Sequence, residues 1–331
     1  MNVKTVFTTL PSLLAAVAST FLLSVAHAVD ASNYPNRPIR FIMPYPVGGT
    51  IDTSGRMVAQ RLGGNLGQQV VVDNRTGAGG TLGTELGAKS PSDGYTIMMG
   101  GTGTLAISPG LGRPLGYHPI NDFAPVTLLA TTPYVLVVHP SVPAASTKEL
   151  IALAKTQPGK LNYASGGSGS APHLIGEMFR TRAAINVLHI PYKGSTPAKI
   201  DLIAGRVHMF FTGIPPVLSE IRNGTLRAIG VTTAKRINTL PEVPTIAESG
   251  VKDFDVSPWF GVLAPAKSPP AIVARLNGEI VKVLRNATLR ERLARDGVDA
   301  VGNSPKEFGD FIRVEMDRWA KAVKESGAKV E

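Results

Sequence analysis

The sequence has no cysteine among its 331 residues. This absence excludes a disulfide framework and a thiolate nucleophile. The fold must therefore be held by the burial of apolar side chains, and a chain of this length can bury enough of them. At about 100–200 residues per domain, the length fits one large domain or two smaller ones.

Acidic and aromatic residues are also scarce. Asp and Glu total 24 against 34 Lys and Arg, which gives a net charge of +10, and aromatic residues make up 6%. A basic balance is compatible with a nucleic-acid partner, but the basic residues are dispersed and no basic run is interleaved with aromatics. We therefore expect no nucleic-acid partner. The charge either creates a field that favours small anions or serves solubility.

Long apolar runs are missing after the N-terminus, so we expect no later transmembrane helix. The first residues carry Lys4, an apolar run over Leu13–Val25 and the small-x-small ending Ala26-His27-Ala28. This pattern predicts a secretory signal peptide over residues 1–28, with cleavage after Ala28. We expect a soluble, exported product, and an uncleaved membrane anchor is the alternative.

Metal and cofactor motifs are lacking as well. The histidines outside the signal peptide show no metal-ligand spacing to another His, Asp or Glu, so we expect no metal site. These histidines are His118, His139, His173, His189 and His208. The P-loop spacing is absent, and Gly101–Ala106 fits the loose dinucleotide pattern but lacks an acidic residue at the end of a second strand. Asp122 lies in a loop-like stretch instead. We therefore expect no cofactor.

What is present is an alternation of β-branched apolar runs with segments of helical period, which predicts an α/β fold with mainly parallel sheets. We expect strands at Ile39–Met43, Gln69–Val72, Tyr95–Met99, Tyr134–Val138, Leu161–Ala164, Val187–Ile190, Val207–Phe211 and Arg227–Val231. We expect helices at Asp52–Leu62, Leu82–Lys89, Lys148–Lys155, Pro172–Thr181, Pro197–Ile203 and Pro216–Arg222, and successive helices from Pro270 to Val323.

No repeat, low-complexity tract or charged linker divides the chain. If there are two lobes, they must be joined by strands that cross between them, near Ala124–Val138 outward and Asp255–Ala264 on return. The first lobe would then be discontinuous. A ligand cleft would lie between the lobes at the carboxyl ends of the strands, where open α/β sheets bind ligands.

Glycine-rich loops follow several of these strands. After Ile39–Met43, the loop Gly48-Gly49-Thr50 leads into a helix that Thr50 or Asp52 can cap. The glycines let the backbone approach a ligand, and the first helical N–H groups have no partner within the helix, so this junction can receive an anion. The same device recurs at Gly77–Thr81, Gly100–Thr104, Ala164–His173 and Tyr192–Pro197.

Together these loops predict a site that holds a carboxylate by N–H and hydroxyl donors, with each helix dipole contributing ~0.3–1 kcal/mol. In the fourth loop Ser170 is the expected N-cap, with Pro172 in the first turn. Lys193 is the one cationic residue at such a loop, and it either contacts the ligand or is a solvated side chain at a turn. His173 is either a ligand contact or a packing residue, and for Asp52 we favour a cap or a contact with a ligand amine over a general base.

A set of motifs in fixed order carries a family resemblance. The motifs are Tyr34–Ile39, Pro44–Asp52, Val71–Gly80, Asp93–Thr96, Asp122–Val126, Pro158–Ser165, His173-Leu174, Pro191–Ser195, Leu226–Ala228, Leu240–Thr245 and Trp259–Pro265. Over nearly all of the mature chain this set resembles the substrate-binding proteins of tripartite tricarboxylate transporters, the Bug or TctC-type periplasmic family.

The resemblance implies a two-lobed periplasmic binding protein of the type II-like α/β fold, in which each lobe is a mainly parallel sheet flanked by helices. Lobe 1 would span 29–131 and 256–331, and lobe 2 would span 132–255. The cleft between the lobes would close on a small organic anion and deliver it to a membrane permease. We expect a periplasmic monomer without catalytic residues.

The resemblance also implies the ligand-binding residues, position by position. These are Tyr45, Gly48, Gly49, Thr50, Asp52, Thr102, Thr104, Ser165, Ser168, Gly169, Ser170, His173, Lys193, Gly194 and Ser195. Two departures stand out. Val47–Ile51 stands where relatives often have a proline-rich loop that contains three glycines. Thr212 stands where relatives often carry an acidic or amide side chain, which favours a plain carboxylate over an amino acid as the ligand.

Two other functions remain open at the level of sequence. The first is an exported serine hydrolase that uses Ser168 or Ser170 with His173, although the nucleophile-elbow spacing is wrong. The second is a protein of the same fold that presents its ligand to a sensor kinase instead of a permease. Citrate-like, aromatic and dicarboxylic acids are all compatible with backbone donors, so the ligand is not identified.

Overall fold

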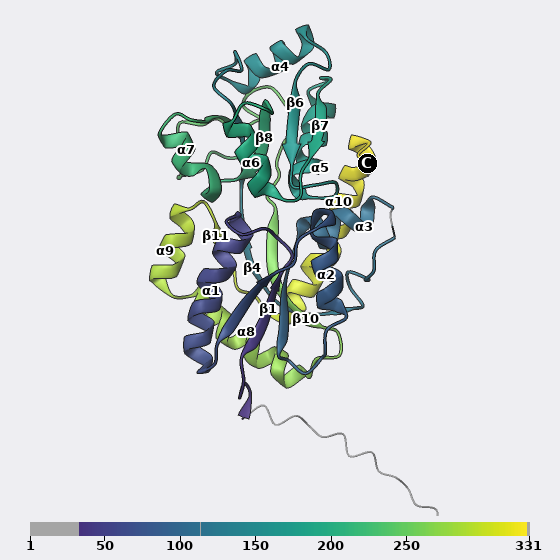
Figure 1. Cartoon of the computed structure of the whole chain (residues 1–331), viewed down its shortest axis with the longest axis vertical. Coiled ribbons are helices and arrows are strands. Elements are labelled where there is room, and N and C mark those ends of the chain that lie inside the picture. Colours follow the sequence, from purple (N-terminus) through teal and green to yellow (C-terminus); the bar gives the residue numbers. More distant parts are fainter. Residues whose placement is uncertain (1–32, 113, 330–331) are drawn as a thin grey trace, which may run out of the picture.

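The computed structural model describes residues 33–112 and 114–329 and contains two β-sheets, each covered by helices and one above the other in Figure 1. The expected α/β, two-lobed architecture is confirmed. We call the part built on the six-stranded sheet the first lobe and the part built on the five-stranded sheet the second lobe. The signal peptide lies outside the described residues, and the lobe boundaries stay a prediction.

The sheet of the first lobe has the strand order β11-β4-β10-β3-β1-β2. Its strands are β1 Ile39–Met43, β2 Val70–Asn74, β3 Thr96–Gly101, β4 Phe123–Thr131, β10 Trp259–Pro265 and β11 Asp299–Ala300. β1 pairs with β2 and β3 in parallel, whereas β10 pairs with β3 and β4, and β11 with β4, in antiparallel.

The sheet of the second lobe has the order β7-β6-β8-β5-β9. Its strands are β5 Tyr134–Val138, β6 Asn162–Ser165, β7 Leu188–Pro191, β8 Met209–Gly213 and β9 Arg227–Val231. β6 pairs in parallel with β7 and β8, and β5 pairs in antiparallel with β8 and β9.

Both sheets are therefore mixed, and the expectation of mainly parallel sheets is wrong. The cause lies in the crossing strands. The chain leaves the first lobe through β4 and returns through β10, and these two strands lie side by side with Trp259 opposite Thr131 and Pro265 opposite Phe123. Two strands that cross the same boundary in opposite directions can pair only in antiparallel.

Helices cover both sheets. In the first lobe they are α1 Thr50–Leu66, α2 Thr81–Ala88, α3 Ser108–Gly110, α8 Pro270–Leu284, α9 Ala287–Arg295 and α10 Pro305–Ser326, with short turns η2 Ala78–Gly80 and the π-helix η3 Thr102–Ile107. In the second lobe they are α4 Thr147–Thr156, α5 Ala171–Arg182, α6 Ser195–Ile203, η4 Pro215–Val217 and α7 Leu218–Arg222.

The apolar period explains how these helices pack. Apolar residues recur on one face of α8 and are buried there, since Ile272, Leu276 and Ile280 are fully inaccessible to solvent. The expected strands are present with ends shifted by no more than two residues. The tail differs in one respect, since the helices from Pro270 onward are interrupted by the short strand β11.

The C-terminal helix α10 connects the two lobes. It begins with a capping box between Ser304 and Glu307 and ends at Gly327 in a left-handed conformation. It packs on β4 of the first lobe and on α5 of the second, and Thr181 of α5 donates a hydrogen bond to the Ser326 carbonyl at 3.1 Å. Figure 1 shows it as the yellow helix that runs along both lobes.

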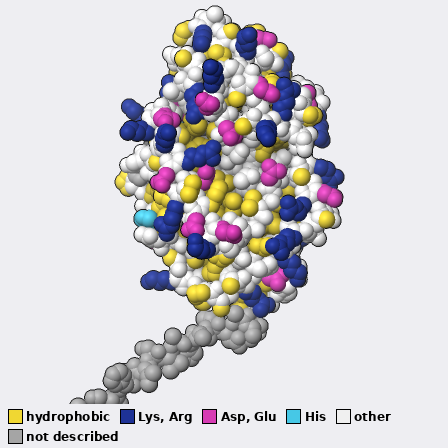
Figure 2. All heavy atoms as spheres, turned by 180° about the vertical axis from the view of Figure 1, so that it is seen from behind, with side chains coloured by type: hydrophobic (Ala, Val, Ile, Leu, Met, Phe, Trp, Pro, Cys, Tyr) yellow, Lys and Arg dark blue, Asp and Glu magenta, His cyan; other side chains and the backbone are white. Residues whose placement is uncertain are grey.

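The surface carries its charge in a dispersed form. Figure 2 shows Lys and Arg side chains scattered among acidic and apolar ones over one face. None of the helices in the described ranges is both long enough and apolar enough to cross a membrane.

Candidate functional site

A cavity of about 80 Å³ lies between the two lobes. At roughly 10–15 Å³ for each water it has room for several water molecules, or for one small organic molecule in their place. Its walls are formed by the β1–α1 loop, the segment before α2, the start of η3 and β10 of the first lobe, and by the loops before α5, α6 and α7 of the second. The cavity thus lies where the sequence predicts a cleft.

Helix N-termini converge on this cavity. Gly49, Thr50 and Ile51 at the start of α1, Gly80 before α2, Ser170 and Ala171 at the start of α5, and Gly194 and Ser195 at the start of α6 all line it. Within the described part of the chain, no N-cap side chain of these helices accepts a hydrogen bond from the first turn. The Thr81 N–H at the start of α2 bonds the Ala78 carbonyl, so it is the orphan N–H groups and positive dipole ends of α1, α5 and α6 that remain available for an anion.

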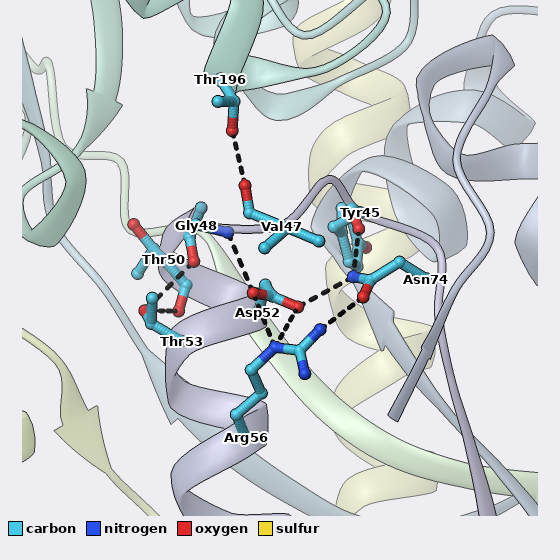
Figure 3. Close-up of polar contacts among 10 residues, drawn as sticks. Tyr45, Val47, Gly48, Thr50, Asp52, Thr53, Arg56, Asn74 and Thr196 are labelled. Carbon is cyan, nitrogen blue, oxygen red and sulfur yellow. Dashed lines mark hydrogen bonds and ion pairs between the residues drawn. The ribbon is translucent and has the colours of Figure 1, made fainter. Parts of the chain in front are cut away.

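Asp52 holds the β1–α1 loop in shape rather than lining the cavity (Figure 3). Its carboxylate accepts hydrogen bonds from the Gly48 N–H at 3.0 Å, from Arg56 at 3.1 Å and from Asn74 at 2.8 Å. Asn74 also donates to the Tyr45 carbonyl at 2.8 Å. Since Asp52 is 1% exposed, this network fixes the loop from behind.

Threonines and a tyrosine form the next part of the first-lobe wall. The Thr102 hydroxyl accepts from the Trp259 N–H at 2.8 Å and lies 3.2 Å from the Trp259 carbonyl. Thr104 bonds to the backbone of Gly101 and does not line the cavity. Tyr45 does line it, and burial raises the pKa of Tyr45 to about 12, so its hydroxyl is neutral.

In the second lobe, a cluster of neutral side chains holds the loop before α5. The Ser165 hydroxyl lies 2.7 Å from Nε2 of His189 and accepts from the Gly167 N–H at 3.0 Å. Nδ1 of His173 accepts from the Gly169 N–H at 3.2 Å, and the two imidazole rings lie 4.3 Å apart. Burial lowers the pKa of both histidines, for His189 to about 4.

The hydroxyls of Tyr45 and Ser170 and the Lys193 ammonium line the cavity without a hydrogen-bond or ion-pair partner among the described residues. The Ser170 hydroxyl is buried at the N-cap position of α5, but it makes no hydrogen bond. The expected N-cap position is confirmed, whereas the expected capping bond is absent. Lys193 is exposed at the edge of the cavity, and nothing in the described part of the chain forms an ion pair with it. Among the described residues that line the cavity it is the only charged one.

The lobes touch each other around the cavity. The Thr196 hydroxyl of the second lobe donates to the Val47 carbonyl of the first at 2.8 Å (Figure 3). A Cβ atom on Gly79 would lie 2.7 Å from the Ser168 carbonyl oxygen, and one on Gly213 would lie 2.2 Å from the Thr50 hydroxyl. Side chains at these two positions would hold the lobes apart, so the structure has the closed arrangement.

The residues expected to bind a ligand divide into two groups. Those that line the cavity are Tyr45, Gly49, Thr50, Thr102, Ser170, Lys193, Gly194, Ser195 and Thr212. Those that lie behind it are Gly48, Asp52, Thr104, Ser165, Ser168, Gly169 and His173. Members of the second group pack against or bond the loops, and this role is invisible in a sequence motif because it depends on the loop conformation.

Sequence reasoning also left lining residues out of the candidate set. These are Thr76, Thr132, Tyr134, Gly166, Pro216, Pro258, Trp259, Phe260 and neighbouring proline and glycine residues. The sequence gives little indication that these residues line a cavity, because most of them lie beside the glycine loops or at the crossing strands. Trp259 follows the returning crossover, and its indole N–H donates to buried Glu315 of α10 at 2.8 Å.

Among the described residues, no hydrogen bond joins the Ser168 or Ser170 hydroxyl to the His173 imidazole, as the alternative hydrolase would require. Ser168 does not line the cavity, the Ser170 hydroxyl has no hydrogen bond, and Nδ1 of His173 is occupied by a backbone N–H. A general base must lie within hydrogen-bond reach of the hydroxyl that it activates. In the described ranges no group of three or more His, Asp and Glu is placed to hold a metal ion.

Comparison with known proteins agrees with this geometry. The family model described as "Tripartite tricarboxylate transporter family receptor" matches residues 55–328. Protein BugT of Bordetella pertussis is 41% identical over 323 residues, which cover 96% of this chain and 98% of that protein.

Two solved structures have the same fold. "R. palustris Rpa4515 with adipate" is 36% identical with a TM-score of 0.88, and it is matched over 90% of this chain and all of that one. "MatC (Rpa3494) from Rhodopseudomonas palustris with bound malate" is 29% identical with a TM-score of 0.84, over 88% of this chain and all of that one. The chain therefore belongs to the tripartite tricarboxylate transporter receptor family, whose Bug-type members are solute-binding proteins.

Proposed function

We propose that this protein is a non-enzymatic solute-binding protein that captures a small organic carboxylate by closure of its two lobes. The observation that carries the proposal is the cavity, where uncapped helix starts from both lobes meet and Lys193 is the only charged side chain among the described lining residues. Such a site attracts an anion, and none of its described lining residues is a carboxylate that would repel one.

The mechanism follows from the position of the donors. The free N–H groups of α1 belong to one lobe and those of α5 and α6 to the other, so an anion is held by all of them only when the lobes are together. The free energy of these contacts favours the closed state. The Ser170 hydroxyl adds a side-chain donor, and the aromatic residues Tyr134 and Trp259 line the remaining wall.

The ligands of two relatives support the class of ligand, since adipate and malate are both small dicarboxylates. We propose that the ligand of this protein is a di- or tricarboxylate or an aromatic acid. With the signal peptide removed after Ala28, the protein would act in the periplasm as a monomer and deliver its ligand to a tripartite tricarboxylate-type membrane permease.

The direct test is a thermal-shift screen of residues 29–331 against mono-, di- and tricarboxylates, aromatic acids and amino acids. A ligand at one hundred times its Kd adds ~2.7 kcal/mol to the free energy of unfolding. We expect one class of carboxylate to raise the melting temperature strongly. Protein refolded from denaturant is screened in parallel, because a co-purified ligand would mask the shift, and a flat screen of refolded protein contradicts the proposal.

A further inference from the structure

A second hollow lies at the boundary of the lobes, outside the ligand cavity. It is a groove of about 710 Å³ between the end of α7 in the second lobe and the end of α9 in the first. Figure 1 shows the two helices on the same side of the molecule, one above the other. Arg222 of α7 and Arg292 and Arg295 of α9 line it, with Pro215 and Leu218 between them.

The charge of this interlobe groove is basic. All three arginines are exposed. The one acidic lining residue, Asp296, pairs with Arg292 at 3.2 Å, while Arg222 and Arg295 form no ion pair with any described residue. An arginine in the last turn of a helix interacts favourably with the negative end of the helix dipole. This local effect does not explain why two such helix ends from different lobes lie at the same groove.

The groove exists only while the lobes are in contact. Its walls come from both lobes, and the Thr239 hydroxyl of the second lobe donates to the Ala294 carbonyl of the first at 3.3 Å. Beside it Gly297 lies so close to Ile214 that a Cβ atom would be 2.7 Å from the Ile214 side chain. Separation of the lobes would move Arg222 away from Arg292 and Arg295.

One loop forms a wall of both the groove and the ligand cavity. Thr212, Gly213 and Pro216 line the cavity, and Pro215 and Leu218 of the same segment line the groove. Lys199 donates to the Pro216 carbonyl at 2.9 Å and holds this segment in place. A ligand that positions the segment in the cavity therefore also shapes the groove, which gives a physical coupling between the two.

We propose that this interlobe groove docks an acidic segment of a protein partner, and that it does so only in the closed, ligand-bound state. Its open form and exposed arginines suit carboxylate side chains along a peptide, and Pro215 and Leu218 offer apolar contact between them. The inference rests on the proposed function, because closure by a carboxylate is what assembles the groove. Docking at this groove would let the membrane partner bind the receptor that holds a ligand and not the ligand-free receptor.

The experiment measures the fluorescence anisotropy of a labelled hexaglutamate peptide as the protein is titrated. It is done with and without the carboxylate that gives the largest thermal shift, beginning with adipate. The variant R222E/R295E is compared with K148E/R313E, which changes the charge equally at exposed residues of α4 and α10. Thermal shifts of both variants with the same carboxylate show that they fold and bind it.

We expect the carboxylate to tighten peptide binding by the wild type, and R222E/R295E to bind the peptide about tenfold more weakly, as reversal of two exposed charges implies. K148E/R313E should keep the wild-type affinity. Equal loss in both variants, or peptide affinity that does not depend on the carboxylate, would overturn the proposal. If no carboxylate gives a thermal shift, the proposed function fails instead, so the two failures are distinguishable.

Discussion

Helices α1, α2, α5 and α6, which begin at the cavity, differ from α4, α9 and α10, which begin elsewhere with a side-chain cap, although α8 also begins elsewhere without one. Away from it, α4, α9 and α10 are capped by Ser146, Asn286 and Ser304, whose side chains accept hydrogen bonds from their first turns. At the cavity, α1, α2, α5 and α6 have no such bond, although α5 has Ser170 in the N-cap position. Serine at the N-cap position therefore accepts a hydrogen bond from the helix in α4 and α10, whereas in α5 its hydroxyl makes no hydrogen bond.

This difference shows where the protein gives up stability for binding. A side-chain N-cap contributes about 1 kcal/mol to a helix relative to Ala, but Gly at the N-cap gives up only about a few tenths of a kcal/mol, so the cavity helices with Gly at this position forgo a small contribution each. The orphan N–H groups are then free to bond a carboxylate. The loops around them need other support, which Asp52 provides in the first lobe and the cluster of Ser165, His173 and His189 in the second.

The largest effect is expected from removal of the support in the first lobe. D52A leaves the Gly48 N–H, Arg56 and Asn74 without their acceptor, and loss of the hydrogen bonds to this buried carboxylate costs about 3 kcal/mol. The control D310A removes an exposed carboxylate that pairs with Lys306 and should cost less than about 1 kcal/mol. Chemical denaturation of the ligand-free proteins measures both, and equal losses would contradict the role of Asp52.

Closure can be blocked without touching any polar group. In G79A the new methyl group meets the Ser168 carbonyl oxygen across the cavity, and such overpacking costs about 1–3 kcal/mol, or about 5- to 150-fold in ligand affinity. G112A is the matched control, because Gly112 has a φ of +71° against +67° for Gly79 but open space around it. Calorimetric titration with the ligand compares them, and equal affinities would show that closure does not bring Gly79 to Ser168.

Two serines at N-cap positions test the comparison directly. S170A should weaken ligand binding about tenfold, since a hydrogen bond to a charged group is worth about 1.5–3 kcal/mol, and leave the ligand-free protein as stable as before. S304A should do the reverse, with a loss of about 1 kcal/mol in unfolding free energy and no change in ligand affinity. Denaturation and titration of both variants give the four values. A stability loss in S170A would mean that its hydroxyl caps α5.

The loop support in the second lobe should also respond to acid. Burial and the neighbouring His173 lower the pKa of His189 to about 4, against about 6.5 in an unfolded chain. The unfolded state therefore binds a proton first, so the contribution of neutral His189 is complete above pH ~6.5 and is lost as the pH falls toward 4. For a ring that is only partly buried we expect a loss of about 1 kcal/mol.

H189Q isolates this contribution, because glutamine keeps a polar partner for Ser165 but does not titrate. Denaturation between pH 7 and 4 should show a shallower loss of stability in H189Q than in the wild type. His173 and Glu177 face the same ring and remain in both proteins, so their effects cancel in the difference. Parallel pH profiles would assign the acid sensitivity to other groups.

Sequence reasoning reached the strands, the helices and the glycine loops because these depend on local patterns. The apolar period placed the expected helix on Ile272, Leu276 and Ile280, and these residues are buried on one face of α8. It missed β11, whose two residues pair with β4, because a short edge strand has no period of its own. It also failed on strand direction, since pairing between β4 and β10 joins residues more than a hundred positions apart.

By itself, the sequence determined that this protein has glycine-rich loops between its strands and helices, and it determined the family. Only the tertiary structure decided which polar side chains face the cavity. His173 and Ser170 are neighbours in one loop, yet the first bonds the Gly169 N–H from behind while the hydroxyl of the second stays unbonded at the cavity. The physical reason is that a hydrogen bond depends on loop conformation, which packing across the lobes sets.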